Sequence, residues 1–287
     1  MIQMRSSGFA ALLPLLAEPL FNVYFARAVI EGRIAGTVYV DDPDCPRATY
    51  ILHPCGMSLL CGPTGLESFT GGILRYMLDE ERTRRHPELV QAHPDAWRGV
   101  FTERLGSRLL LMDDPRRLGL DSAGVQDLGR GCVIEWGRVN FEFDRAAFES
   151  MEEPRLPPGF RLERAGREVF RPWEGPVLPD SFWASPEDFE RNGVAFAIFE
   201  GVRPLCVAFS AWVLDGVLEI GIETHPEARK RGLASLACSA LIRYSLSKGL
   251  EPVWSAHSGN KPSQVLAARL GFRETLQVPY YRLVENG

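Results

Sequence analysis

The sequence predicts an α/β fold, on three observations in its second half: consecutive apolar runs, a tight hairpin signal, and a helix that opens on a glycine-containing basic turn. Asp215-Gly216 separates two of the runs, and this dipeptide is typical of a two-residue turn between antiparallel strands. The predicted order is strand, strand, strand, helix, strand, helix, strand. The strands cover residues 194–200, 205–214, 217–224, 252–257 and 279–284.

Two amphipathic helices follow the third strand. Apolar residues recur at spacings of three and four from Leu233 to Tyr244, which indicates one buried helix face. Lys248-Gly249 predicts the end of this helix, because a cation and a left-handed glycine both suit a helix C-terminus. Asn260 predicts the cap of the second helix, which runs to Gly271.

The first half predicts a separate set of elements. Apolar runs at residues 34–40, 48–52 and 57–61 read as strands, and residues 133–143 read as a strand-rich end. Thr64-x-x-Glu67 predicts a capping box and a helix to about Arg82, and a second helix covers residues 95–105. Residues 150–159 hold Pro154, Pro157 and Pro158 and predict a linker. We therefore expect two domains, residues 1–150 and 156–287.

Composition excludes several classes of protein. A net charge of −5 argues against nucleic-acid or anionic-membrane binding, because both need a basic face. No apolar run has the length of a membrane span, and the start lacks the pattern of a signal peptide, so we expect a cytoplasmic protein. Histidines and cysteines show no metal-ligand spacing, Cys206 and Cys238 read as small core residues, and free thiols are favoured over disulfides. Whether the chain is a monomer or a homodimer stays open.

Three cations, Arg229, Lys230 and Arg231, precede the helix that starts near Gly232. Helix starts carry unpaired N–H groups and the positive end of the dipole, so cations there are unfavourable without an anion between them. Phosphate is the usual anion at such a place, and a glycine lets the backbone approach it closely. The alternative is a solvated, arginine-rich helix start.

Several motifs resemble one family. Arg229-x-x-Gly232-x-Ala234 after a strand resembles the acyl-CoA pyrophosphate loop of the GNAT superfamily of N-acyltransferases. The run from Trp254 through Asn260 to Phe272 resembles the closing motif of a bacterial GNAT branch with a degenerate, GNAT-like first half. The resemblance covers most of the chain. It implies a C-terminal GNAT domain, with a mixed and mostly antiparallel sheet flanked by helices, and a degenerate N-terminal domain.

The resemblance implies an acetyl-CoA-dependent N-acetyltransferase that acts on a small amine or amino-acid-like acceptor. The first half has Cys61-Gly-Pro-Thr-Gly65 in place of the basic loop, which indicates that it does not bind acetyl-CoA. Asn260 has a plain helix cap as an equally good interpretation. The implied contacts to acetyl-CoA are Ile222, Thr224, Arg229, Lys230, Arg231, Gly232, Leu233, Ala234, Asn260 and Ser263.

The catalytic groups follow from the same resemblance. Glu219 and Glu223 share one face of a strand, and either could take the proton of the amine, with Glu223 preferred. Each also reads as a structural or solvated carboxylate. Many GNAT enzymes have a tyrosine acid where this chain has Ala267, which leaves Tyr280, Tyr281 or a water molecule as the acid. This departure keeps open a second function, a non-catalytic acyl-CoA-binding or sensing protein.

Overall fold

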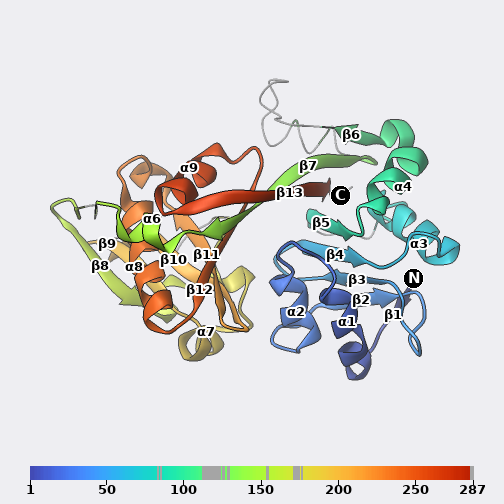
Figure 1. Cartoon of the computed structure of the whole chain (residues 1–287), viewed down its shortest axis with the longest axis horizontal. Coiled ribbons are helices and arrows are strands. Elements are labelled where there is room, and N and C mark those ends of the chain that lie inside the picture. Colours follow the sequence, from blue (N-terminus) through green and yellow to red (C-terminus); the bar gives the residue numbers. More distant parts are fainter. Residues whose placement is uncertain are drawn as a thin grey trace. The chain divides into compact units, whose positions relative to one another are not determined.

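The protein is described by a computed structural model over residues 1–82, 84, 86–111, 124, 127, 130–152, 155–170, 175 and 177–284. Pro154 of the predicted linker lies outside the described residues. The predicted α/β class is confirmed, since mostly antiparallel strands are flanked by helices (Figure 1). The chain forms two units: unit 1 is residues 1–139, 257–259 and 277–287, and unit 2 is residues 140–256 and 260–276.

Unit 2 holds the elements that the second half of the sequence predicts. Its strands are ordered β12-β11-β10-β9-β8, with β11 parallel to β12 and the other pairs antiparallel. Segments 140–143 of β7 and 272–276 of β13 also belong to it. Its elements are α6 (Arg145–Glu149), β8 (Phe160–Ala165), α7 (Pro186–Asn192), β9 (Ala195–Glu200), β10 (Arg203–Leu214), β11 (Val217–Thr224), α8 (Leu233–Ser247), β12 (Glu251–His257) and α9 (Lys261–Arg269).

The local signals of the second half fold as predicted. Asp215 and Gly216 both have positive φ, 50° and 78°, as a tight hairpin turn requires. Lys248 caps α8 and Gly249 follows with φ of 70°. The side chain of Asn260 accepts a hydrogen bond from the Ser263 amide at the start of α9. These turns and caps depend on neighbouring residues alone, so sequence was enough to predict them.

Helices α8 and α7 mark two faces of the unit 2 sheet. Leu218 and Ile220 of β11 are buried in one core with the apolar face of α8. Figure 1 shows α8 beside the strands of unit 2. The alternate residues of β11 face the other way, where Gly221 lies against the ring of Phe209. An aromatic cluster continues from Phe209 to the residues that precede and form α7. It contains Phe182, Trp183, Phe189, Phe209 and Trp212.

Unit 1 is also a sheet with helices. Its strand order is β1-β2-β3-β4-β5-β13-β7, with β6 parallel to β7. All five residues of β4 are buried, so helices or loops cover both of its faces. The elements are β1 (Ile2–Gln3), α1 (Leu13–Leu16), α2 (Tyr24–Ile30), β2 (Thr37–Val40), β3 (Thr49–Leu52), β4 (Met57–Cys61), α3 (Glu67–Met77), β5 (Glu88–His93), α4 (Ala96–Leu105), β6 (Leu109–Leu111), and parts of β7 (Val133–Phe143) and β13 (Phe272–Leu283).

The structure corrects two details of the first half. Helix α3 begins at Glu67 with no side-chain cap, and Thr64 instead accepts a bond from the Thr70 hydroxyl through its carbonyl, so the capping box was wrong. The helix ends at Met77, five residues before Arg82. Strand β5 was not predicted, because its sequence mixes polar and apolar residues without a strand pattern. In the structure it pairs with β4 on one side and with β13 on the other.

The two units are not contiguous in sequence, whereas the sequence predicted a linear division at residues 150–156. Strand β13 is the reason. Its residues Phe272 to Leu276 belong to unit 2, but Tyr281 pairs with Val90 of β5 in unit 1. Unit 1 is therefore completed by the end of the chain. Whether each part folds and acts as a separate domain stays a prediction.

Candidate functional site

The first feature of the site is the open N-terminus of α8. Helix α7 is capped by Ser185 and α9 by Asn260, each of which accepts a bond from a first-turn amide. Helix α8 starts at Leu233, and its N-cap residue is Gly232, which has no side chain, so no side-chain cap satisfies the first turn. Its first N–H groups have no acceptor within the helix either. These amides are therefore available to an anion.

The loop before α8 has an unusual backbone. Lys230 and Gly232 have positive φ, 62° and 79°, and only the second is a glycine. A lysine in the left-handed region is uncommon and often marks a functional loop. No atom lies within 4 Å of where a Cβ of Gly232 would stand. The space beside the helix start is open, and successive amides turned in this way form a concave surface that suits phosphate.

The three cations of the loop differ in what they contact. The Arg229 guanidinium donates to the Thr224 carbonyl at 3.0 Å and pairs with Glu223 at 3.4 Å. The Arg231 guanidinium stacks over the Phe160 ring, 4.6 Å from its centre. Lys230 is exposed and makes no ion pair or hydrogen bond with any described residue. Lys230 is therefore the cation that is free to meet an incoming anion.

The second feature is an open edge on β11. Strands β11 and β12 run parallel and pair over three positions that end at Glu219 and Val253. Beyond these residues β11 continues for five residues to Thr224 and stays paired with β10 on its other side. Among the described residues, no strand pairs with the edge of β11 from Ile220 to Thr224 that leads directly to the loop before α8. An extended polar chain can bind such an edge as an added strand does.

Glu219 lies where the two strands separate. Its side chain is buried, and its Oε1 accepts a hydrogen bond from the Ser255 hydroxyl of β12 at 2.9 Å. Sequence reasoning missed Ser255, although a polar residue inside the short apolar strand 252–257 was a usable signal.

Glu223 lies closer to the loop, on the same face of β11. Its carboxylate accepts from the Thr224 amide at 3.1 Å and pairs with Arg229. A Cβ at Gly175 would come within 3.1 Å of its Oε2, so the backbone there also encloses this carboxylate. With a rise of about 3.3 Å per residue, the two glutamates are roughly 13 Å apart along the strand. They therefore occupy opposite ends of the open edge.

A buried thiol lies beside the open edge. Cys206 pairs with Thr224 in register, and its Sγ is 3.2 Å from the Thr224 hydroxyl. Burial, with a smaller contribution from Glu223, raises the pKa of the Cys206 thiol to about 12. The thiol is therefore protonated near neutral pH and is not a nucleophile. Cys238 is also buried in the core, as the sequence predicted, and all six cysteines are free.

The residues on α9 have structural partners of their own. Asn260 caps the helix, and the Ser263 hydroxyl accepts a bond from the Trp254 indole at 3.2 Å. Ala267 is fully buried in the unit 2 core. The cap interpretation of Asn260 is confirmed. Contacts from Asn260 and Ser263 to a ligand stay predictions.

Tyr280 and Tyr281 both belong to unit 1, whereas the loop and β11 belong to unit 2. Tyr281 is in the unit 1 core with its ring edge against Phe101, 4.9 Å away. Burial, and to a smaller extent Glu135, raises the pKa of Tyr281 well above its usual range. Tyr280 lies under the Arg138 guanidinium, and its hydroxyl is 3.4 Å from Arg138 Nη1. The predicted glutamates and loop lie together in unit 2, and a role for either tyrosine stays a prediction.

The corresponding loop of unit 1 is closed. Strands β4 and β5 pair over five positions, from Met57 with Leu89 to Cys61 with His93. The Gly62 amide then donates to the His93 carbonyl, which extends the pairing past the strand end. A Cβ at Gly62 would lie 2.4 Å from the Arg47 carbonyl oxygen, so this glycine serves internal packing. The pocket beside the loop is lined by Asp41, Asp42 and Glu67 and by one cation, Arg47, which is already paired with Asp41. Its net negative charge disfavours phosphate.

Two features are absent from the residues that the structure describes, a metal-ligand cluster and a membrane-spanning helix. No group of three or more histidine, cysteine, aspartate or glutamate side chains is arranged to hold a metal ion. Within the same part of the chain, no helix combines the length and apolar character that crossing a membrane requires.

Known proteins resemble this chain over nearly its whole length. A family model described as GNAT acetyltransferase matches residues 18–281. The uncharacterized N-acetyltransferase YdfB of Bacillus subtilis (strain 168) is 23% identical over 259 residues, which are 90% of this chain and 89% of that protein.

Solved structures share the fold. A GCN5-related N-acetyltransferase-like protein from Streptococcus suis 89/1591 superposes with a TM-score of 0.66 at 20% identity, over 96% of this chain and 98% of that one. A tandem GNAT protein from the clavulanic acid biosynthesis pathway gives a TM-score of 0.55 at 14% identity, over 100% of this chain and 98% of the other. The predicted GNAT fold is confirmed.

Proposed function

The chain belongs to the GNAT acetyltransferase family, and we propose that unit 2 transfers the acetyl group of acetyl-CoA to a small amine or amino-acid-like acceptor by direct attack. The observation that carries this proposal is the uncapped start of α8 at the end of the open β11 edge. An anion-binding helix start and an unpaired strand edge, joined by one loop, suit a ligand with a diphosphate and an extended amide-bearing arm.

The loop from Arg229 to Ala234 would hold the pyrophosphate of acetyl-CoA. The amides of Gly232, Leu233 and Ala234 would donate to it, and Lys230 would add a charge. The edge at Ile222 and Thr224 would pair with the pantetheine arm, and the bound thioester supplies the acetyl group. Arg229 and Arg231 would act mainly by holding the loop through their contacts with Glu223 and Phe160.

Glu219 is the better candidate for the general base. The arm would enter at the loop, so its reactive end would lie deep in the opening, toward the point where β11 and β12 pair. Glu219 lies at that point, whereas Glu223 lies beside the loop and is already held by Arg229. This order differs from the preference for Glu223 that the sequence suggested.

The general acid would be a water molecule. Tyr280 and Tyr281 are both engaged in unit 1, and the position of the common tyrosine acid is the buried Ala267. A thiolate is a moderate leaving group, so a dedicated acid is not essential. The absence of a tyrosine at the position of Ala267 also favours the second candidate, a non-catalytic acyl-CoA-binding protein.

Paired glycine variants test the proposal. Gly232 and Gly249 flank the two ends of α8, both have positive φ, and neither has a neighbour within 4 Å of its Cβ position. Gly232→Val should weaken acetyl-CoA binding by roughly 100-fold, as expected for the loss of two or three charge-assisted hydrogen bonds. Gly249→Val carries the same backbone strain and should leave binding unchanged.

Two measurements separate the outcomes. Calorimetry gives the acetyl-CoA affinity, and release of free CoA over a panel of amines gives turnover. Tight binding of acetyl-CoA with no turnover on any amine would favour the binding protein. Equal affinities for the wild type and Gly232→Val would refute the phosphate-loop role altogether.

A further inference from the structure

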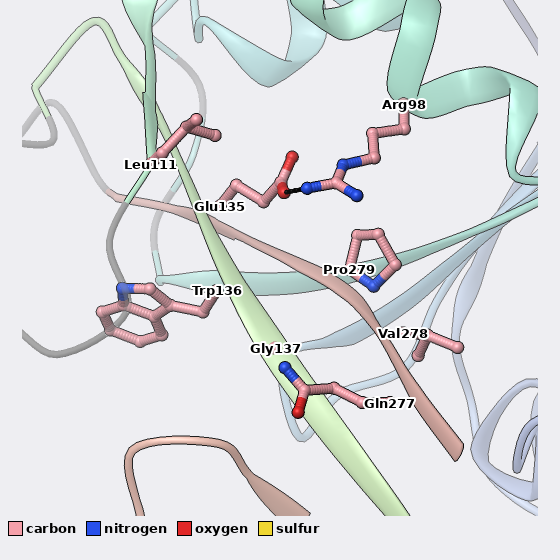
Figure 2. Close-up of a pocket in the computed structure, with 8 residues that line it drawn as sticks. All are labelled: Arg98, Leu111, Glu135, Trp136, Gly137, Gln277, Val278 and Pro279. Carbon is pink, nitrogen blue, oxygen red and sulfur yellow. Dashed lines mark ion pairs between the residues drawn. The ribbon is translucent and has the colours of Figure 1, made fainter.

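The two faces of the unit 1 sheet differ in how their charges are paired. On the face that α4 covers, Glu135 of β7 pairs with Arg98, with 2.8 Å between Oε1 and Nη2 (Figure 2). The Tyr281 ring of β13 lies in the core of the same face. Side chains alternate between the faces along a strand, so the next residues, Trp136 and Arg282, belong to the opposite face. Figure 2 shows Trp136 directed away from the Glu135–Arg98 pair.

Arg282 is a cation of that opposite face without a counter-ion. Its guanidinium stacks over the Trp136 ring, 5.5 Å from the ring centre, and its Nε is buried. Among the residues that the structure describes, Arg282 forms no ion pair and no side-chain hydrogen bond. Burial lowers the pKa of Arg282, because it removes water from the charged group. A guanidinium that loses water without gaining an anion is unfavourable, so its surroundings favour a bound anion.

Solvent reaches this part of the sheet. Arg282, Trp136 and Leu89 are each only partly buried. Strand β13 lies between β5 and β7, so Arg282 has Leu89, its register partner, on one side and the Trp136 ring on the other. A ligand that contacts the guanidinium therefore also meets apolar surface on both sides of it.

A buried amide on the same face also lacks partners. Gln91 follows Val90, which pairs with Tyr281 and lies in the core under α4, so Gln91 belongs to the face of Arg282. Gln91 is fully buried, and neither its Nε2 nor its Oε1 has a hydrogen-bond partner among the described residues. It is two residues from Leu89, which places it diagonally across from Arg282 at about 7–8 Å. Buried polar groups are nearly always paired, so this face lacks a polar partner.

The chemistry of these groups favours a monocarboxylate. A guanidinium presents a planar fork of N–H donors, which matches the two oxygens of a carboxylate. Arg282 carries one charge without a counter-ion, so a monoanion neutralises it, whereas a phosphate dianion brings a second charge that Arg282 does not balance. The apolar surfaces of Trp136 and Leu89 suit a short hydrocarbon or aromatic body.

We propose that this face of unit 1 binds a small carboxylate with an apolar body, its carboxylate on the Arg282 guanidinium and its body against Trp136 and Leu89. All three residues belong to unit 1, so the site goes beyond the acetyl transfer proposed for unit 2. A neutral or cationic ligand would leave the charge of Arg282 without a counter-ion.

The test is direct binding without acetyl-CoA. Calorimetry with benzoate and with isobutyrate should give saturable binding to the wild type. Benzamide has the shape of benzoate without its charge and should bind at least about tenfold more weakly. Arg282→Gln should weaken benzoate binding by roughly tenfold or more, because it removes charge-assisted hydrogen bonds. Arg282→Lys keeps the charge but loses the planar fork, so its affinity should lie between those of Arg282→Gln and the wild type.

Two control variants locate the binding. Arg75→Gln makes the same change of charge at an exposed arginine of α3 and should bind benzoate as the wild type does. Gly232→Val alters the start of α8, which also favours anions, and it should bind benzoate as the wild type does too. Inorganic phosphate should compete with benzoate only at concentrations roughly tenfold higher or more.

Several outcomes would overturn the proposal. These are no saturable binding of either carboxylate, equal affinities for benzoate and benzamide, stronger binding of phosphate than of benzoate, equal benzoate binding by Arg282→Gln and the wild type, or loss of it in Gly232→Val. If Arg282→Gln does not fold, equal benzoate affinities of Arg282→Lys and the wild type would overturn it. Acetyl-CoA affinity should be unchanged in the Arg282 variants, so this proposal and the acetyl-transfer proposal can fail separately.

Discussion

Units 1 and 2 share one arrangement, a strand that leads through a glycine-containing loop into a helix and then into a parallel strand, and they differ in whether the two strands separate. In unit 2, β11 and β12 pair only as far as Glu219 and Val253. In unit 1, β4 and β5 pair along all of β4, and the Gly62 amide extends the pairing. An open strand edge exists in the first case and is filled by a neighbouring strand in the second.

Each unit has a buried glutamate next to its parallel strand pair, and the two glutamates differ in their hydrogen bonds. Glu219 of unit 2 accepts from Ser255, and Glu88 of unit 1 accepts from Ser58 at 3.2 Å. Glu88 also accepts from Tyr50 and Tyr76 and pairs with Arg84, so its oxygens are saturated. Glu88 is thus fully hydrogen-bonded within unit 1, whereas Glu219 lies where β11 and β12 separate. Strand separation is thus the structural difference on which the proposed role of Glu219 rests.

The largest expected effect is on the stability of unit 1. Glu88→Gln leaves the buried Arg84 without its counter-ion, and we expect a loss of roughly 3–5 kcal/mol in the free energy of unfolding. Urea titration followed by circular dichroism measures it. Glu67→Gln, which removes an exposed carboxylate of the same unit, is the control and should have little effect. An equally small effect of both variants would contradict a structural role for Glu88.

The second expected effect is on catalysis in unit 2. Glu219→Gln should lower kcat by roughly 10²-fold, as loss of a general base does, with acetyl-CoA affinity unchanged. Glu223→Gln should lower it less, because that carboxylate is held by Arg229 near the loop. Steady-state kinetics over a pH series compares them. A larger loss in Glu223→Gln would restore the order that the sequence suggested, and full activity in both would assign the proton to water or a histidine.

The third effect is an acid sensitivity of unit 1. Burial lowers the pKa of His53 to about 3, and its Nδ1 accepts from the Cys55 amide. Below the ordinary histidine pKa of about 6.5, His53 binds a proton in the unfolded chain but not in the folded one. The free energy of unfolding therefore decreases as the pH is lowered. Between pH 7 and pH 5 the loss from this group is about 2 kcal/mol.

His53→Gln removes this titration, so its unfolding free energy should fall less between pH 7 and pH 5 than that of the wild type. The exposed His86 provides the control, since His86→Gln should behave as the wild type does. Urea titrations at several pH values give the difference. Identical pH dependence in the wild type and His53→Gln would show that folding does not lower the pKa of His53.

Sequence reasoning succeeded where a signal is local. The Asp215-Gly216 hairpin, the cap by Asn260 and the end of α8 at Gly249 all depend on a few neighbouring residues. It failed where partners are distant. Strand β5 reads as a polar segment because its stability comes from pairing with β4 and with β13, which is almost 200 residues away. Ser255 gained a meaning only when β12 placed it beside Glu219.

The α/β class, the order of elements in unit 2 and the glycine-containing basic loop could all be predicted from consecutive residues, because periodicity, turn chemistry and charge are local properties. Tertiary structure decided which strand edge stays open, which cations of the loop are free, and that the last residues of β13 complete unit 1. The reason is physical: strand pairing and burial join residues far apart in the chain, and no short pattern records which partner they find.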